Sequence, residues 1–190
     1  MGLKRHSISN TTPQDVVFGA GIVVKGLTWE SNDWKYTELG ATSGGNKLSY
    51  VREFVDLELD GKTVKVEGMD IEVGSTGKVT MNLAEYKKET LITALGLVHD
   101  TSDSTTGYTC YKPAGKPEYV ENLGFVGFTA DNRPVIAIFE KAVCLGAYEV
   151  EQKNKEQGTI ALEFDAVAPT DAGEFTKLPV RFYWPDAATV

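Results

Sequence analysis

Alternation of apolar and polar residues runs through most of this chain and predicts β-strands. The segment DVVFGAGIVVKG, residues 15–26, is rich in Val and Ile, and its two glycines predict a bend or bulge within the strand. Two runs joined by ADNRP, residues 130–134, are apolar on both faces, which is typical of central strands in a packed sheet. Residues 147–168 predict a hairpin, and LPVRFYW, residues 178–184, predicts the last strand.

The period of two is clearest between residues 48 and 67. If Asp60-Gly61 is a two-residue turn, Leu57 faces Val64 and one register suits both faces of the pair. We therefore predict a hairpin that turns at Asp60 and Gly61. The segment MDIEVGSTGKVTMNL, residues 69–83, repeats this design and predicts a second hairpin with GSTG as its loop.

A change of period to that of a helix occurs at AEYKKETLITALG and predicts a helix over about residues 84–95, with Gly96 as its C-terminal cap. About eight or nine antiparallel strands with one helix make the fold mainly β, an antiparallel β-sandwich or partly open barrel with one flanking α-helix. We expect a flexible N-terminal arm at residues 1–14, a single domain at residues 15–185 and a C-terminal tail at residues 186–190.

A long loop without a sustained period is predicted for residues 27–46 and carries several aromatic side chains. Because Trp and Tyr are enriched at interfaces, the loop could be a contact between subunits. It could equally cover one end of the sandwich or stack on a sugar. The candidate contact residues are Trp29, Trp34, Tyr36, Leu39, Thr42, Gly44, Gly45 and Asn46.

Charge and composition exclude several classes of protein. The formal net charge of −8 argues against a nucleic-acid binder, because such proteins hold phosphates with clustered Lys and Arg. The sequence has no apolar run long enough for a membrane span and begins without the apolar core of a secretory signal, so we expect no membrane partner. Cys110 and Cys144 are expected to be free thiols.

A row of acids from Asp56 to Glu67 nearly fits the EF-hand loop, with Glu58 in place of the usual Asp or Asn at the third position. An EF-hand loop lies between two helices, whereas this segment alternates as strands do. A hairpin with an acidic face explains the same residues, so we predict no metal site.

Catalytic motifs are not found in the sequence. His6 and His99 belong to no recognisable motif, and the pair Gly19 and Gly21 lacks the third glycine and the helix of a dinucleotide fingerprint. A pair of carboxylates at glycosidase spacing could exist in space, and solvated strand faces explain the same acids. We predict that the protein is not an enzyme and uses no cofactor.

The order of several blocks resembles the major tail tube proteins of long-tailed phages and prophages of Gram-positive bacteria. The blocks are LGATSGGN, the turn at Leu59-Asp60-Gly61, NLAE at the start of the helix, and IALEFDA, and the resemblance spans residues 16–185. It implies a phage tail-tube-like fold whose copies form hexameric rings by joining sheet edges, and rings that stack into the conduit for DNA. The loop at residues 27–46, with the candidate contact residues given above, and the N-terminal arm are then the expected contacts between rings.

The same resemblance implies the partners and the location. Besides itself, the subunit would meet the tape measure protein and the tail terminator or distal tail proteins, in the host cytoplasm during assembly and then in the virion tail. Phage DNA would pass without specific binding if acids face the channel; the candidates are Asp56, Glu58, Glu72 and Glu163. Alternatives are a tube of a contractile tail or injection apparatus, and a β-sandwich that binds a glycan or cell-surface ligand through exposed Trp residues.

Overall fold

The computed structural model describes residues 12, 16–146, 148–152, 154–155, 157–171, 173 and 177–185. Apart from Thr12, the predicted N-terminal arm lies outside these residues, and so does the predicted C-terminal tail. The described chain is mainly antiparallel β-structure with one helix, as the sequence predicted. In chain order its elements are β1 (Val17–Glu30), β2 (Asp33–Glu38), β3 (Thr42–Asp56), β4 (Asp70–Leu83), α2 (Lys88–Leu95), β5 (Leu97–His99), β6 (Tyr111–Pro113), β7 (Tyr119–Thr129), β8 (Pro134–Cys144), β9 (Glu149–Glu151), β10 (Thr159–Ala166) and β11 (Val180–Tyr183).

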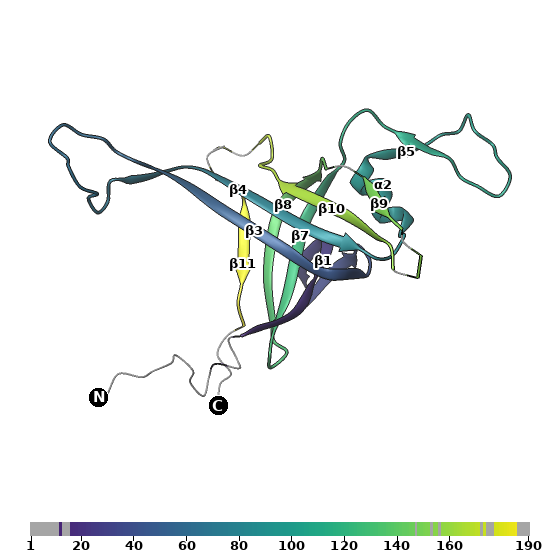
Figure 1. Ribbon diagram of the computed structural model, residues 1–190, viewed down its shortest axis with the longest axis horizontal. Coiled ribbons are helices and arrows are strands. Elements are labelled where there is room, and N and C mark those ends of the chain that lie inside the picture. The colour runs from purple at the N-terminus through teal and green to yellow at the C-terminus, as the bar shows by residue number, and fades with distance from the viewer. Residues whose placement is uncertain are drawn as a thin grey trace.

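Nine strands form one sheet that folds over itself into two layers. The path of neighbours is β2-β1-β7-β8-β10-β4-β3, with β11 added to β8 and β9 added to β10. The fold occurs at β8, because residues 136–139 pair with β11 whereas residues 142–144 pair with β10. Strands β3, β4 and β10 therefore cross over β7 and β8, as Figure 1 shows. Strands β5 and β6 form a separate two-stranded sheet.

Two apolar clusters lie on opposite faces of the layer built by β1, β7 and β8. The larger cluster lies between the two layers and includes Val23, Phe139 and Phe164. The smaller cluster contains Val24 and Ile138, the chain neighbours of Val23 and Phe139, which therefore point to the other face. Trp34 of β2 packs against this second cluster. The layer is thus covered on both faces, which explains why residues 123–128 of β7 and 134–139 of β8 are apolar without alternation.

The predicted helix is confirmed and begins at Lys88, four residues later than expected. Gly96 ends it in the left-handed conformation, and its N–H donates to the carbonyls of Ile92 and Thr93. The buried hydroxyl of Thr90 donates to the carbonyl of Leu39, which ties the helix to the segment between β2 and β3. The predicted strands around ADNRP, the β9–β10 hairpin, and the bulge near the glycines of β1 are also confirmed.

The long loop predicted for residues 27–46 is wrong. Residues 17–38 instead form a hairpin of β1 and β2, in which Trp29 is paired with Trp34. Its two turn residues, Ser31 and Asn32, both have positive φ angles, as a two-residue hairpin turn of the common type requires. The segment from residue 42 onward belongs to β3.

The two predicted hairpins between residues 48 and 83 are also wrong. One long hairpin replaces them, in which β3 pairs with β4 from Thr42↔Leu83 to Asp56↔Asp70. A turn does form at Asp60 and Gly61, where the N–H of Lys62 donates to the carbonyl of Leu59 over 3.0 Å, but it lies within the loop 57–69 and joins no strands. The GSTG segment is an uninterrupted part of β4.

Candidate functional site

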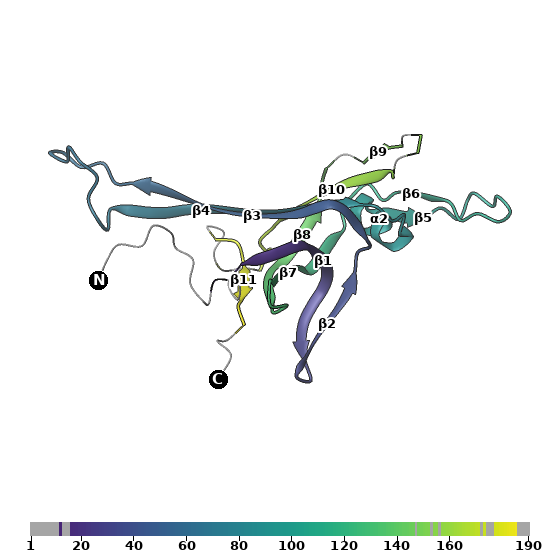
Figure 2. The same ribbon diagram turned by 60° about the horizontal axis from the view of Figure 1, so that its bottom comes forward.

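The far half of the β3–β4 hairpin, with its loop, projects beyond the two layers. We call residues 51–73 the arm, which is distinct from the N-terminal arm predicted at residues 1–14. Figures 1 and 2 show it leaving the body on one side, away from the β1–β2 hairpin, with only its base near β11. In the arm, β3 and β4 pair only with each other among the described residues. A two-stranded hairpin on its own is marginally stable in water, so a projecting one is expected to meet a partner.

Large apolar side chains are exposed along the whole arm. Val55 and Ile71 are cross-strand partners, and each is about half exposed, at 51% and 49%. Leu59 and Val64 in the loop are exposed to 57% and 71%. The other exposed apolar residues of the arm are Val51, Phe54, Leu57, Val66 and Val73. Contiguous exposed apolar surface of this kind marks an interaction site.

The two lysines of the arm loop are held by acids at the ends of β3 and β4, whereas Glu58, Asp60 and Glu67 form no ion pair among the described residues. The ammonium group of Lys62 binds the carboxylate of Asp56 and, at 2.8 Å, the carbonyl of Leu57. Lys65 lies 3.1 Å from Asp70. The acids that resemble an EF-hand therefore surround a lysine in a loop between two strands, and no group of acids, His or Cys in the described part of the chain is arranged to hold a metal ion.

The outer edge of β3 is a long free sheet edge. Among the described residues β3 has a strand partner only on its β4 side. The pairing runs without a break from Asn46↔Met81 to Glu53↔Gly74, and irregularities lie on either side of this stretch. The first is a bulge at Gly44 and Gly45, which both have positive φ angles. An uncovered edge free of proline is a template for another strand.

A groove lined by aromatic side chains lies where the β1–β2 hairpin meets β11. Its volume is about 520 Å³. Trp34 lies at its centre, with ring centroids 5.2 Å from Trp29 and 5.1 Å from Tyr183, and both pairs meet edge to face. The lining residues are Trp29, Trp34, Pro134, Ile136, Tyr183, Trp184 and Pro185. The rings of Trp29 and Trp34, which were candidates for stacking on a sugar, are therefore not coplanar.

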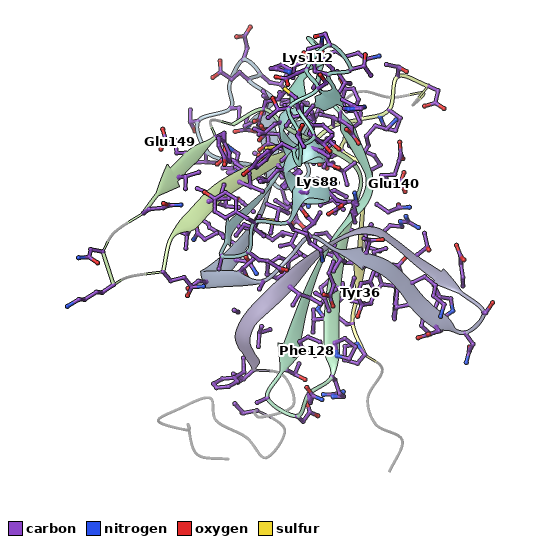
Figure 3. The ribbon with its side chains drawn as sticks, turned by 90° about the vertical axis from the view of Figure 1, so that its right-hand side faces the viewer. Tyr36, Lys88, Lys112, Phe128, Glu140 and Glu149 are labelled. Carbon is purple, nitrogen blue, oxygen red and sulfur yellow. The ribbon has the colours of Figure 1, made fainter. Side chains whose placement is uncertain are left out.

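The predicted contact residues separate into four groups in the structure. Trp29 and Trp34 line the groove, whereas Tyr36 is an exposed residue of β2 (Figure 3). Leu39 is completely buried in the core, so the prediction that it forms a contact is wrong. The remaining four, Thr42, Gly44, Gly45 and Asn46, lie at the start of β3, where Asn46 donates to the carbonyl of Gly21 and to the hydroxyl of Thr42.

The four predicted channel acids lie on different surfaces. Asp56 ends β3 and Glu58 belongs to the arm loop. Glu72 binds Arg52 at 2.7 Å on the inner face of the hairpin, and this bond holds the pKa of Glu72 below its ordinary value. Glu163 lies on the outer face of β10.

That outer face of β3, β4 and β10 carries polar side chains outside the arm; we call it the open face. In its middle, Lys78 lies 2.7 Å from Glu163 and 3.6 Å from Asp165. The hydrogen bond to Glu163 raises the pKa of Lys78, which therefore stays charged between the two carboxylates. Ser49 and Thr80 are the cross-strand neighbours of Lys78 and Glu163. The three charged groups together have a net charge of −1.

The other candidate groups are scattered. His99 is exposed and contacts the ring of Tyr111 with centroids 5.9 Å apart, while His6 lies outside the described residues. Cys110 and Cys144 are both free, and burial raises the pKa of the Cys144 thiol. In the described part of the chain no helix is long and apolar enough to cross a membrane.

Sequence reasoning missed the arm and its apolar surface. The signal that could have found it is a set of apolar runs for which the sequence offers no second set of apolar residues as cover. These runs contain Val55, Leu57, Val64, Val66 and Ile71. The groove was found only in part, because Tyr183 and Trp184 join it from the far end of the sequence.

No family model matches the sequence. No curated protein matches it either. Several chains of solved structures are similar to it, among them the following two. One is the tail of an empty gene transfer agent particle, refined with C6 symmetry, at a TM-score of 0.41 and 10% identity over 79% of this chain and 92% of that one. The other is the virion of a native gene transfer agent particle, at a TM-score of 0.44 and 9% identity over 87% of this chain and 96% of that one.

Proposed function

We propose that this chain is a structural subunit of a phage-type tail tube, in which hexameric rings stack into a conduit for DNA. The observation that carries the proposal is the arm together with the free edge of β3, because the apolar side chains of the arm are exposed and no strand in the described chain pairs with that edge. The sequence resemblance to tail tube proteins supports it independently. The subunit acts by assembling rather than by catalysing a reaction.

Strand addition at the β3 edge supplies the contact within a ring. From residue 46 to residue 53 the edge offers an unbroken ladder, about 26 Å long at roughly 3.3 Å per residue. A strand from a neighbouring copy would continue the sheet through backbone hydrogen bonds, while side chains select the partner. A contact between two different surfaces closes into a ring when the rotation allows it.

The open face is the surface of this subunit best suited to line the channel. It is polar, and its central cation, Lys78, is already held by Glu163 and Asp165, so that it offers little to a phosphate. Lys47 lies on the same face, where it is paired with Thr80. The two lysines and the two carboxylates together have no net charge, so DNA would pass without a basic patch to hold it. Of the four predicted acids only Glu163 lies on this face, and we assign Glu72 to the contact with Arg52 instead.

The remaining parts of the proposal follow from the tube. Tape measure protein would fill the channel before DNA does, and terminator or distal tail proteins would meet the last rings. The protein would assemble in the host cytoplasm and reside in the virion tail. A tube of a contractile tail or injection apparatus would use the same surfaces.

Electron microscopy of the purified, concentrated protein tests the proposal. We expect rings or tubes in negative stain and large particles in sedimentation velocity. A protein that stays monomeric over all concentrations and salt conditions, with the arm intact, would refute it.

A further inference from the structure

The arm loop of one copy and the aromatic groove of another have matching surfaces. The loop presents Leu57, Leu59, Val64 and Val66 to solvent. The groove presents aromatic rings, two prolines and an isoleucine, with no charged side chain among its lining residues. Its volume of about 520 Å³ is several times that of a cavity of roughly 150 Å³ that holds one benzene ring, so it has room for more than one aliphatic side chain.

Charge limits which part of the loop can enter the groove. A charged group that enters an apolar groove is costly unless it keeps a partner. Both lysines of the loop keep one, because Lys62 binds Asp56 and Lys65 binds Asp70 within the same arm. The carboxylates of Glu58, Asp60 and Glu67 form no ion pair among the described residues, so they would have to stay in water at the rim of the groove while the apolar side chains enter it.

The arm loop of a molecule does not reach the groove of the same molecule. The arm loop projects from one side of the body, whereas the groove lies at the turn end of the β1–β2 hairpin, beside β11 (Figures 1 and 2). Both surfaces are exposed, since Leu59 and Trp184 are exposed to 57% and 67%. A second copy of the chain supplies the missing partner for each surface.

We propose that the loop 57–69 of one copy docks in the groove formed by Trp29, Trp34, Tyr183 and Trp184 of a second copy. This inference rests on the proposed tube function and assigns the contact between stacked rings. The contact joins two different surfaces, so each copy can receive one arm and extend another. A head-to-tail contact of this type propagates instead of closing in a pair.

Photo-crosslinking in assembled particles tests the assignment. Leu59 is replaced by p-benzoylphenylalanine, and this protein is mixed with isotope-labelled parent protein before assembly and irradiation. We expect crosslinked peptides that join residue 59 of one copy to residues 29–34, 134–136 or 183–185 of another. Tubes whose crosslinks lie only on other surfaces would overturn the inference and leave the tube intact. A failure of the unmodified protein to form rings or tubes would overturn the proposed function and, with it, the inference.

A double-variant experiment measures the coupling between the two surfaces. L59S and W184S both change exposed side chains, and each should raise the protein concentration needed for tubes by about tenfold, as expected when a central apolar contact is lost. If the two residues meet, the double variant should be little worse than either single variant, and rings should persist where tubes do not. If the effects of the two substitutions multiply, the contact is overturned. It is also overturned if a photo-crosslinker placed in the groove reaches only residues 1–14. A W184S variant that assembles normally and loses only glycan binding would overturn it as well.

Discussion

Replacing the exposed cross-strand pair Val55 and Ile71 by threonine should weaken assembly without unfolding the subunit. Thr keeps the branched shape that suits a strand and removes apolar surface. Complete burial of a Val or Ile side chain contributes about 1.5–3 kcal/mol, and each of these residues is already half buried in the free chain. Covering the exposed halves in an assembly therefore contributes about 2 kcal/mol for the pair. This loss corresponds to about a 30-fold higher concentration for assembly.

Sedimentation velocity over a concentration series, with negative-stain microscopy of each sample, measures this shift in V55T/I71T. The matched control is V98T, which changes a valine of similar exposure on β5, at the end of the molecule where Figure 3 shows Lys112. Chemical unfolding of dilute monomer should change by less than about 1 kcal/mol in both proteins. If V55T/I71T assembles at the same concentration as the parent, the arm is not an assembly surface and the reasoning from its exposure fails.

Two further predictions concern the subunit itself. In G77A the added methyl group would lie 2.8 Å from the ring of Phe139, so we expect a loss of about 1–3 kcal/mol in the free energy of unfolding in urea, and an unchanged stability would show that the ring can move. Hydrogen bonds from Ser102, together with Lys112, lower the pKa of Asp100 to about 2, so the folded loop gains stability above about pH 4 and loses it as the pH falls through about 2. Carbon-detected NMR should show Asp100 titrating near 2 in the parent and at a higher pH in S102A; a parent value near 4 would contradict the hydrogen bonds.

The elements that were predicted correctly are those that can be recognised from neighbouring residues in the sequence, without knowing their distant partners. Strands β7 and β8 have clusters on both faces, so their apolar runs can be recognised without knowing the partners. The helix has its own period and a glycine cap at Gly96, and both are local. The β9–β10 hairpin has buried Ile160 and Leu162 on one face and partners close in sequence.

The sequence-based predictions of strands and hairpins failed where residues that are typical of turns make packing contacts within a strand. In GSTG, the hydroxyl of Ser75 accepts a hydrogen bond from the N–H of Leu178, and Gly77 leaves space for the ring of Phe139. Both residues look like a loop in the sequence, yet both are required by contacts with distant segments. The Asp60-Gly61 turn is real, but the ladder that it was expected to close ends at Asp56, before the loop begins. The aromatic groove likewise depends on β11, which no local pattern connects to β2.

The two irregularities around residues 46–53 have a consequence for how far adjacent subunits can slide. A slip of one residue along this edge would turn the side chains of the neighbour's strand to the opposite face of the sheet, and a larger slip would run into the glycine bulge at Gly44 and Gly45. The unbroken part of the edge therefore has a fixed length. In the proposed tube it would set the relative height of neighbouring subunits, and the wall of the tube would have a constant pitch determined by each subunit.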